Sequence, residues 1–168
     1  MIQKKVCMLG AFAVGKTSLV ARFVSSIFTD KYHSTVGVKV DKKQLRIGEH
    51  DVNLMLWDLA GEDEFNKVQG TYLRGSSGYL LVMDATRRAT LDTALVLHER
   101  ARGVAGSVPW ILVINKIDLE ADLDLDEDRL SRLAQDGWTV IRSSAKTGQG
   151  VEEAFHTLAE RMITAAGA

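Results

Sequence analysis

Apolar and polar residues follow two different periods along the chain, and the two periods alternate from one end to the other. Apolar runs of strand length are predicted at Lys5–Leu9, Gly37–Ile47, Val52–Asp58, Tyr79–Asp84, Trp110–Asn115 and Thr139–Arg142. Runs with helical spacing are predicted at Gly15–Ser26, Phe65–Leu73, Leu91–Gly103, Asp126–Gln135 and Val151–Ala165. A strand followed by a helix, repeated in this way, predicts a mostly parallel sheet with helices on both faces.

One segment departs from this alternation. Residues Gly48–Asp51 join two adjacent predicted strands with turn-forming residues, which predicts one antiparallel pair. The chain has 168 residues, without repeats, low-complexity tracts or an obvious linker, which fits one domain. We therefore expect a single α/β domain over residues 1–168, with a six-stranded, mostly parallel sheet.

The composition narrows the class of protein. A hydrophobic content of 46% and a charged content of 26% are those of a globular chain, and a formal net charge of −1 gives no support for nucleic-acid binding. The single cysteine, Cys7, rules out a disulfide within one chain. No signal peptide and no apolar stretch long enough to span a bilayer occurs in the sequence.

The most specific chemical motif is G-x-x-x-x-G-K-[ST] at Gly10–Thr17, between the first predicted strand and the first predicted helix. In this context backbone N–H groups at a helix N-terminus surround phosphate, and Lys16 reaches the terminal phosphates of a nucleoside triphosphate. The Thr17 hydroxyl is expected to bind Mg²⁺. The residues predicted to bind phosphate are Gly10, Ala11, Phe12, Ala13, Val14, Gly15, Lys16, Thr17 and Ser18.

Further candidate residues follow the predicted third, fifth and sixth strands. Ligands of open α/β sheets bind at the carboxyl ends of the strands, so these loops should lie beside the phosphate-binding loop. Asp58 is expected to hold Mg²⁺ through water, and the backbone N–H of Gly61 to approach a γ-phosphate. The other candidates are Asn115, Lys116 and Asp118 after the fifth strand, and Ser144, Ala145 and Lys146 after the sixth.

The Asn-Lys-x-Asp element has a physical interpretation as a selector of guanine. A carboxylate at Asp118 accepts hydrogen bonds from the ring N–H and exocyclic amine of guanine, whereas adenine would leave it unpaired. The stem of Lys116 can lie on one face of the base, and the N–H of Ala145 can donate to the guanine carbonyl. Phe28 either covers another part of the base or is a core aromatic.

Taken together, in this order and at this spacing, the motifs resemble those of a small GTPase of the Ras superfamily, over residues 4–163. Ser34-Thr35-Val36-Gly37-Val38, with the pair Trp57-Asp58, is closest to the Rab branch. The resemblance implies a P-loop NTPase domain of the G-domain type that binds GTP or GDP with Mg²⁺ and hydrolyses GTP. It implies that Thr35 binds Mg²⁺ and the γ-phosphate only in the GTP state.

The same resemblance implies the catalytic set and the partners. The catalytic candidates are Lys16, Thr35, Gly61 and Glu62. Effector, exchange and activating proteins would bind the two switch loops of a monomer, which the resemblance places in the cytoplasm.

Two departures from the family pattern bear on the rate of hydrolysis. The family has Gln where this chain has Glu62, and an ionised Glu can accept a hydrogen bond but not donate one to the γ-phosphate. A raised pKa would instead make Glu62 a base for the attacking water, so Glu62 could either slow or speed hydrolysis.

The second departure is in the phosphate-binding loop, where Phe12 and Ala13 replace small glycines. A ring at Phe12 would either block an arginine inserted by an activating protein or pack harmlessly. We expect slow intrinsic hydrolysis; the alternative is an interaction module that signals by GTP occupancy alone.

A third departure concerns the last residues of the sequence. The segment Thr164–Ala168 contains no cysteine, so this chain carries no site for a prenyl membrane anchor. Either the sequence stops after the last helix of a longer protein, or the protein works without a lipid anchor, which would suit a prokaryotic member of the superfamily.

Overall fold

The computed structural model describes residues 1–26, 28, 38–59 and 70–167. The strands are β1 (Ile2–Gly10), β2 (Val38–Ile47), β3 (His50–Leu59), β4 (Gly78–Asp84), β5 (Trp110–Asn115) and β6 (Val140–Arg142). The helices are α1 (Lys16–Ser25), α2 (Gly70–Leu73), α3 (Ala89–Ala105), α4 (Glu127–Gln135) and α5 (Val151–Gly167), with a short 3₁₀ helix, η3 (Glu120–Asp122).

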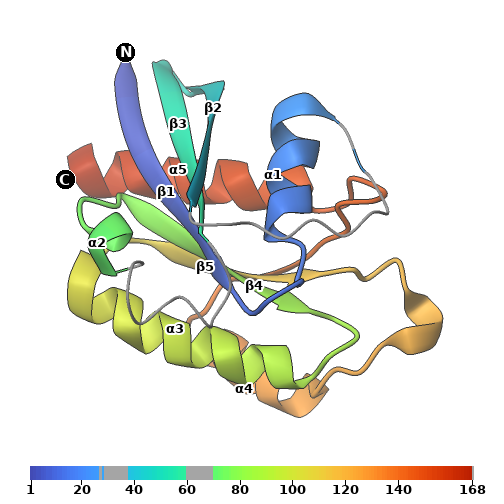
Figure 1. The fold of residues 1–168 in the computed structure, drawn as a ribbon. Coiled ribbons are helices and arrows are strands. Elements are labelled where there is room, and N and C mark those ends of the chain that lie inside the picture. Colours follow the sequence, from blue (N-terminus) through green and yellow to red (C-terminus); the bar gives the residue numbers. More distant parts are fainter. Residues whose placement is uncertain (27, 29–37, 60–69, 168) are drawn as a thin grey trace.

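The strands of the described residues form one sheet in the order β2-β3-β1-β4-β5-β6 (Figure 1). β2 runs antiparallel to β3, and all other neighbours are parallel. The predicted architecture, with one antiparallel pair in a mostly parallel sheet, is therefore confirmed. The turn between β2 and β3 is shorter than predicted, because β2 ends at Ile47 and β3 already begins at His50. Gly48, at φ 59°, supplies the left-handed conformation in this turn.

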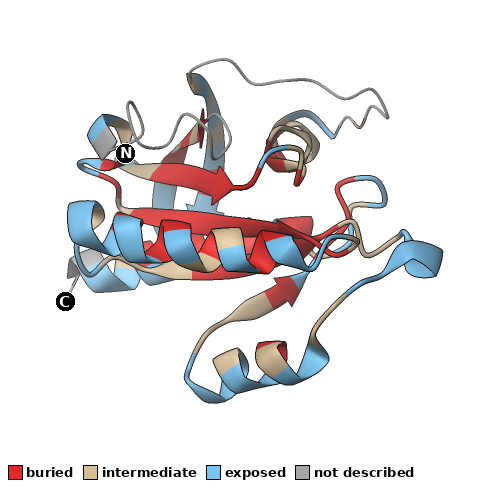
Figure 2. Ribbon diagram, turned by 60° about the horizontal axis from the view of Figure 1, so that its bottom comes forward, coloured by how far each residue is buried: buried red, intermediate tan, exposed pale blue. Residues whose placement is uncertain are grey.

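Successive side chains of the central strands enter cores on opposite faces of the sheet. In β1, Val6 and Met8 join the core that α1 and α5 cover, whereas Cys7 and Leu9 join the core under α3 and α4. Burial on both faces explains why these strands are apolar at every position instead of at alternate ones. Figure 2 shows the result, with buried strands in the middle and helices exposed on their outer sides.

The two cores hold different aromatic contacts. Phe23 of α1 stacks on Phe155 of α5, with ring centroids 4.1 Å apart and ring planes within 3°. On the other face, the buried His98 of α3 faces Tyr79 of β4, with Nδ1 2.9 Å from the phenol oxygen, and its ring packs against Trp110. Burial lowers the pKa of His98 and raises the pKa of Tyr79 to about 12. Both groups are therefore neutral near pH 7.

Some boundaries differ from the predicted ones. β1 begins at Ile2 instead of Lys5, because pairing with β3 continues down to Ile2 opposite Val52. α4 begins one residue later than predicted, since the side chain of Asp126 accepts a hydrogen bond from the N–H of Arg129 and caps the helix. The helix predicted at Phe65–Leu73 is described only from Gly70 onward. No helix in the described part of the chain is long and apolar enough to cross a bilayer.

Candidate functional site

The loop from Gly10 to Lys16 connects the end of β1 to the start of α1. Gly15 adopts φ 101° just before the helix, and a Cβ atom there would lie 2.3 Å from Nδ2 of Asn115. The motif glycine is therefore required both by its backbone conformation and by the close approach of another loop. Ala13 also has a positive φ, 62°, which is uncommon for a residue other than glycine. The loop therefore has a demanding conformation that its surroundings must maintain.

Lys16, the lysine of the motif, is buried at the start of α1, and its side chain folds back over the loop. Its Nζ donates to the backbone oxygens of Gly10 at 3.1 Å and Ala11 at 3.4 Å. Burial lowers the pKa of Lys16, and the nearby carboxylate of Asp58 partly offsets this effect. The loop thus places a cation at its own centre, within reach of an anion bound there.

Thr17 and Asp58 meet beside this lysine, although they lie 41 residues apart in the sequence. The hydroxyl of Thr17 donates to Oδ2 of Asp58, which lies near the end of β3 and is 1% exposed. Hydroxyl and carboxylate oxygens are hard donors of the kind that Mg²⁺ prefers, so the pair fits the predicted metal. No group of three or more His, Cys, Asp or Glu that could hold a metal ion occurs among the residues described.

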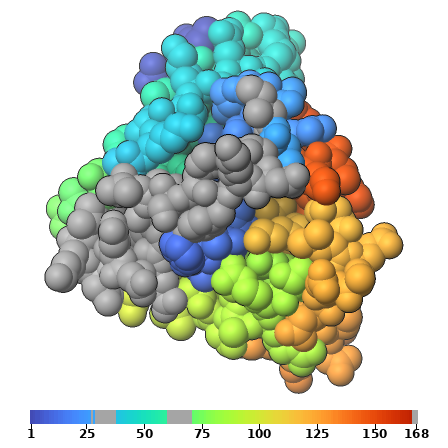
Figure 3. Space-filling view, turned by 45° about the vertical axis from the view of Figure 1, so that its right-hand side comes forward, coloured from blue at the N-terminus to red at the C-terminus, as the bar shows by residue number. Residues whose placement is uncertain are grey.

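Asn115 forms hydrogen bonds that connect three loops at the carboxyl end of the sheet. Its Nδ2 donates to the backbone oxygen of Val14 at 3.1 Å. Its Oδ1 accepts from the N–H of Ala145 at 3.2 Å and from the hydroxyl of Ser143 at 3.3 Å. The phosphate-binding loop and the loops after β5 and β6 therefore share one buried amide. Figure 3 shows the blue early part of the chain meeting the green and orange segments at this end of the molecule.

The other two specified residues of the Asn-Lys-x-Asp element, Lys116 and Asp118, also form hydrogen bonds to neighbouring loops. Lys116, at φ 69°, donates from Nζ to the backbone oxygen of Ala13 at 2.9 Å. Asp118 accepts a hydrogen bond from the hydroxyl of Ser144 at 2.7 Å, and that hydroxyl in turn accepts from the N–H of Thr147. The carboxylate of Asp118 is thus oriented by the next loop, as a group that must recognise a planar ligand should be.

The structure brings most of the predicted site residues to one edge of the sheet, and the surroundings of three of them bear on their predicted roles. The N–H of Ala145 donates to Asn115 in this structure, so its hydrogen bond to a base stays a prediction. Phe28 is half-buried and packs against the core that α1 and α5 cover, as expected of a core aromatic, and its contact with a base also stays a prediction. Phe12 is 54% exposed, and its effect on a partner's arginine stays a prediction.

Several predicted residues lie outside the described part of the chain. They are Thr35, Gly61 and Glu62, with the rest of the first switch segment up to Gly37. Their proposed roles therefore stay predictions.

Two residues near the site were missed by the sequence analysis. Asp84 ends β4, and its Oδ2 lies 3.0 Å from Nζ of Lys116. Arg87 follows in the next turn and donates from Nη2 to the backbone oxygen of Phe12 at 2.9 Å. The rule that singled out Asp58 and Asn115, a polar residue at the carboxyl end of a central strand, applies equally to Asp84.

Sequence comparisons with known proteins cover nearly the whole chain. The sequence pattern of the Ras family matches residues 5–164. The Ras-related protein Rab-1 of Theileria parva is 33% identical over 161 residues, which cover 94% of this chain and 73% of that protein. Human Rab-4A is 35% identical over 161 residues, which cover 95% of this chain and 74% of that protein. Mouse Rab-21 is 35% identical over 164 residues, which cover 96% of this chain and 74% of that protein.

Proposed function

The chain belongs to the Ras family, and on that premise we propose that the loops joined by Asn115 form its GTP site. Family membership makes the protein a GTP-binding, GTP-hydrolysing molecular switch. The observation that carries the assignment of the site is the meeting of Thr17 and Asp58 beside the buried Lys16. Lys16 and Thr17 begin α1, whereas Asp58 lies near the end of β3, so the fold brings a cation, a hydroxyl and a carboxylate together at the loop, as a phosphate with its metal ion requires.

At the phosphate end, the N–H groups of the loop and the ammonium of Lys16 stabilise the charge that develops during transfer of the γ-phosphoryl group. Thr17 and Asp58 would hold Mg²⁺, with Thr35 as a further ligand in the GTP state. When bound, Mg²⁺ neutralises charge on the β- and γ-phosphate oxygens. The surrounding loop lies in a fixed conformation, so these donors need little rearrangement as the charge develops.

At the base end, Asp118 selects guanine. Its carboxylate already accepts one hydrogen bond from Ser144, which leaves other acceptor positions for the N–H groups of the base. Lys116 packs its stem along the base, and its ammonium stays on the backbone oxygen of Ala13. We expect Ser144, Ala145 and Lys146 to line the remaining side of the base.

Hydrolysis is slow in this proposal because two positions depart from the family pattern, Glu62 for the intrinsic reaction and Phe12 for the reaction stimulated by an activating protein. Phe12 places an exposed ring at the edge of the loop, where an arginine from an activating protein would have to enter. Glu62 lacks the donor of the family Gln. The alternative is a module that signals by GTP occupancy with negligible turnover, and the same two residues favour it.

Partners would bind the surface next to the switch segments. Trp57 of β3 and Tyr72 of α2 lie there as a half-buried pair, with ring centroids 5.7 Å apart. Lys5 holds its ammonium 4.0 Å from the Trp57 ring centre, within the range of a cation–π contact. We propose that effector, exchange and activating proteins bind here, and that the protein acts as a monomer in the cytoplasm.

Single-turnover hydrolysis of pre-bound GTP in excess Mg²⁺, without partners, tests the proposal. We expect a rate below the ~10⁻⁴ s⁻¹ scale of an unassisted Ras-type enzyme. The double variant F12G/E62Q should be faster by about tenfold, equivalent to about 1.4 kcal/mol of transition-state stabilisation. E62Q alone should account for this gain, because blocking a partner's arginine cannot slow a reaction measured without partners. Each single variant serves as the control for the other. A wild-type rate near ~10⁻² s⁻¹ would contradict slow hydrolysis, and phosphate release no faster than that of free GTP would favour the occupancy module.

A further inference from the structure

Two neighbouring backbone oxygens of the phosphate-binding loop accept hydrogen bonds from two cations. Nη2 of Arg87 donates to the oxygen of Phe12 at 2.9 Å, and Nζ of Lys116 donates to the oxygen of Ala13 at 2.9 Å. Both cations also bind one carboxylate oxygen, Oδ2 of Asp84, from Nε of Arg87 and Nζ of Lys116, each at 3.0 Å. We call Asp84, Arg87 and Lys116 the Asp84 clamp.

Asp84 is a rigid base for this clamp. Its side chain is 2% exposed, and its Oδ1 accepts from the N–H of Thr86 at 2.8 Å and from the hydroxyl of Thr86 at 2.7 Å. Burial alone would raise the pKa of Asp84, but hydrogen bonds from Thr86, Lys116 and Arg87 together lower it. The carboxylate is therefore ionised and fully oriented before any ligand binds.

Arg87 is equally constrained by its backbone. The hydroxyl of Thr90 donates to the backbone oxygen of Arg87 at 2.6 Å and accepts from the N–H of Asp84 at 2.9 Å. The hydroxyl of Thr90 therefore bridges the two ends of the turn between β4 and α3 and fixes its backbone. The planar guanidinium then uses two nitrogens of its rigid fork, Nε for Asp84 and Nη2 for Phe12, which fixes the two acceptors relative to each other.

The clamp determines the direction of two N–H groups in the loop. In a trans peptide the carbonyl of one residue and the N–H of the next lie in one plane and point in opposite directions. Holding the oxygen of Phe12 on the outer side therefore aims the N–H of Ala13 to the inner side, and the bond to Ala13 does the same for the N–H of Val14. Ala13, with φ 62°, is the residue between these two planes and the one least able to hold this conformation unaided.

We infer that Arg87 is a positioning residue for nucleotide binding, which acts through the peptide planes of the phosphate-binding loop. Since Lys116 belongs to the base-binding element, the Asp84 clamp also couples the base end of the site to the phosphate end. The inference rests on the proposed function in taking Gly10–Thr17 as the phosphate site. It predicts that loss of Arg87 accelerates release of bound nucleotide.

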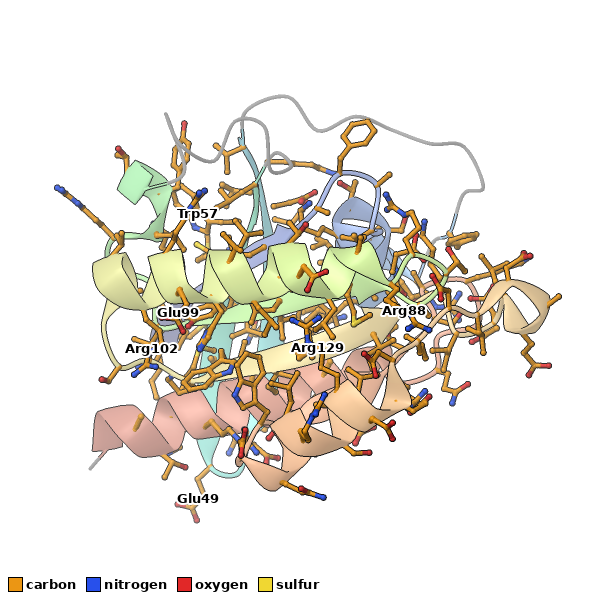
Figure 4. All side chains as sticks on the ribbon, turned by 90° about the horizontal axis from the view of Figure 1, so that it is seen from below. Glu49, Trp57, Arg88, Glu99, Arg102 and Arg129 are labelled. Atoms are coloured by element: carbon orange, nitrogen blue, oxygen red, sulfur yellow. The ribbon has the colours of Figure 1, made fainter. Side chains whose placement is uncertain are left out.

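The release rate of GDP from the full chain, followed after addition of excess unlabelled GDP, tests this role. R87A should release GDP about five to ten times faster than the wild type, the effect of losing one partly exposed, charge-assisted hydrogen bond. R87K should be intermediate, because an ammonium keeps the charge but lacks the rigid fork that fixes the two acceptors relative to each other. R88A is the matched control: Arg88, at the N-terminal end of α3 (Figure 4), pairs with Asp124 and not with the loop, so its release rate should equal that of the wild type.

A second variant tests whether Arg87 acts through Asp84. D84N keeps an acceptor for Thr86 but presents an amide NH₂ to the two cations, so adding R87A to D84N should change release by less than it does in the wild type. Equal release from R87A and wild type would overturn the inference. So would slower GTP hydrolysis in R87A with unchanged GDP release, which would mean that Arg87 touches the phosphate itself. Failure of the proposed function would look different, because the wild type would then not retain GDP.

Discussion

Replacing Asn115 with alanine should destabilise the protein by about 2 to 6 kcal/mol. The side chain is 1% exposed and joins three loops through its two polar atoms. Its removal leaves the N–H of Ala145 and the oxygen of Val14 without this partner, and each buried unsatisfied group costs about 1 to 3 kcal/mol. The hydroxyl of Ser143 adds little to the loss, because it can rotate toward another acceptor.

The assay is urea unfolding of the GDP-loaded protein at several GDP concentrations, with free energies of unfolding extrapolated to water. Weakened nucleotide binding contributes a part that changes with the GDP concentration, whereas the lost hydrogen bonds contribute a part that does not. The control is S143A, which removes only the 3.3 Å bond to Asn115 and should cost about 1 kcal/mol or less. N115D keeps both acceptor bonds but turns a buried carboxylate toward the oxygen of Val14, so it should cost more than the lost donor bond alone.

Two outcomes would refute this reasoning. If N115A lost no more stability than S143A, the buried amide would not hold the loops together. If the whole loss followed the GDP concentration, Asn115 would act on the nucleotide and not on the fold.

Two further predictions concern base selection and pH. D118N should lose selectivity for GTP over other nucleoside triphosphates by about 100-fold or more in competition binding, since an amide cannot replace both acceptor oxygens; tight, selective GTP binding by D118N would disprove the assignment. Because burial lowers the pKa of His98 in the folded protein, the unfolded chain takes up the proton first as the pH falls below about 6.5. The free energy of unfolding should then fall by up to about 1.4 kcal/mol per pH unit. The fall should be smaller in H98Q, and H156Q is the control. An identical pH dependence of H98Q and wild type would contradict this prediction.

The sequence predicted the sheet well because burial on both faces imposes a strong pattern on the central strands. The boundary at Ile2 was missed because polar residues Gln3 to Lys5 interrupt the apolar run, while backbone pairing with β3 continues through them. Backbone pairing does not depend on the side chain, so the hydropathy pattern does not reveal it.

The site was predictable where a motif specifies both residue type and spacing, as in Gly10–Thr17 and Asn115–Asp118. The Asp84 clamp was not, because its contacts join a backbone oxygen to side chains from two other loops. Every residue has a backbone oxygen, so the residue type at position 12 does not indicate that Arg87 donates to it.

The stacking of Phe23 on Phe155 has a consequence for synthesis on the ribosome. Phe23 leaves the ribosome early, whereas Phe155 belongs to the last helix of this sequence. Until α5 is made, the nascent chain cannot cover the apolar face that Val6, Met8 and Phe23 share. The emerging chain therefore exposes this apolar face until α5 has formed and packed against it.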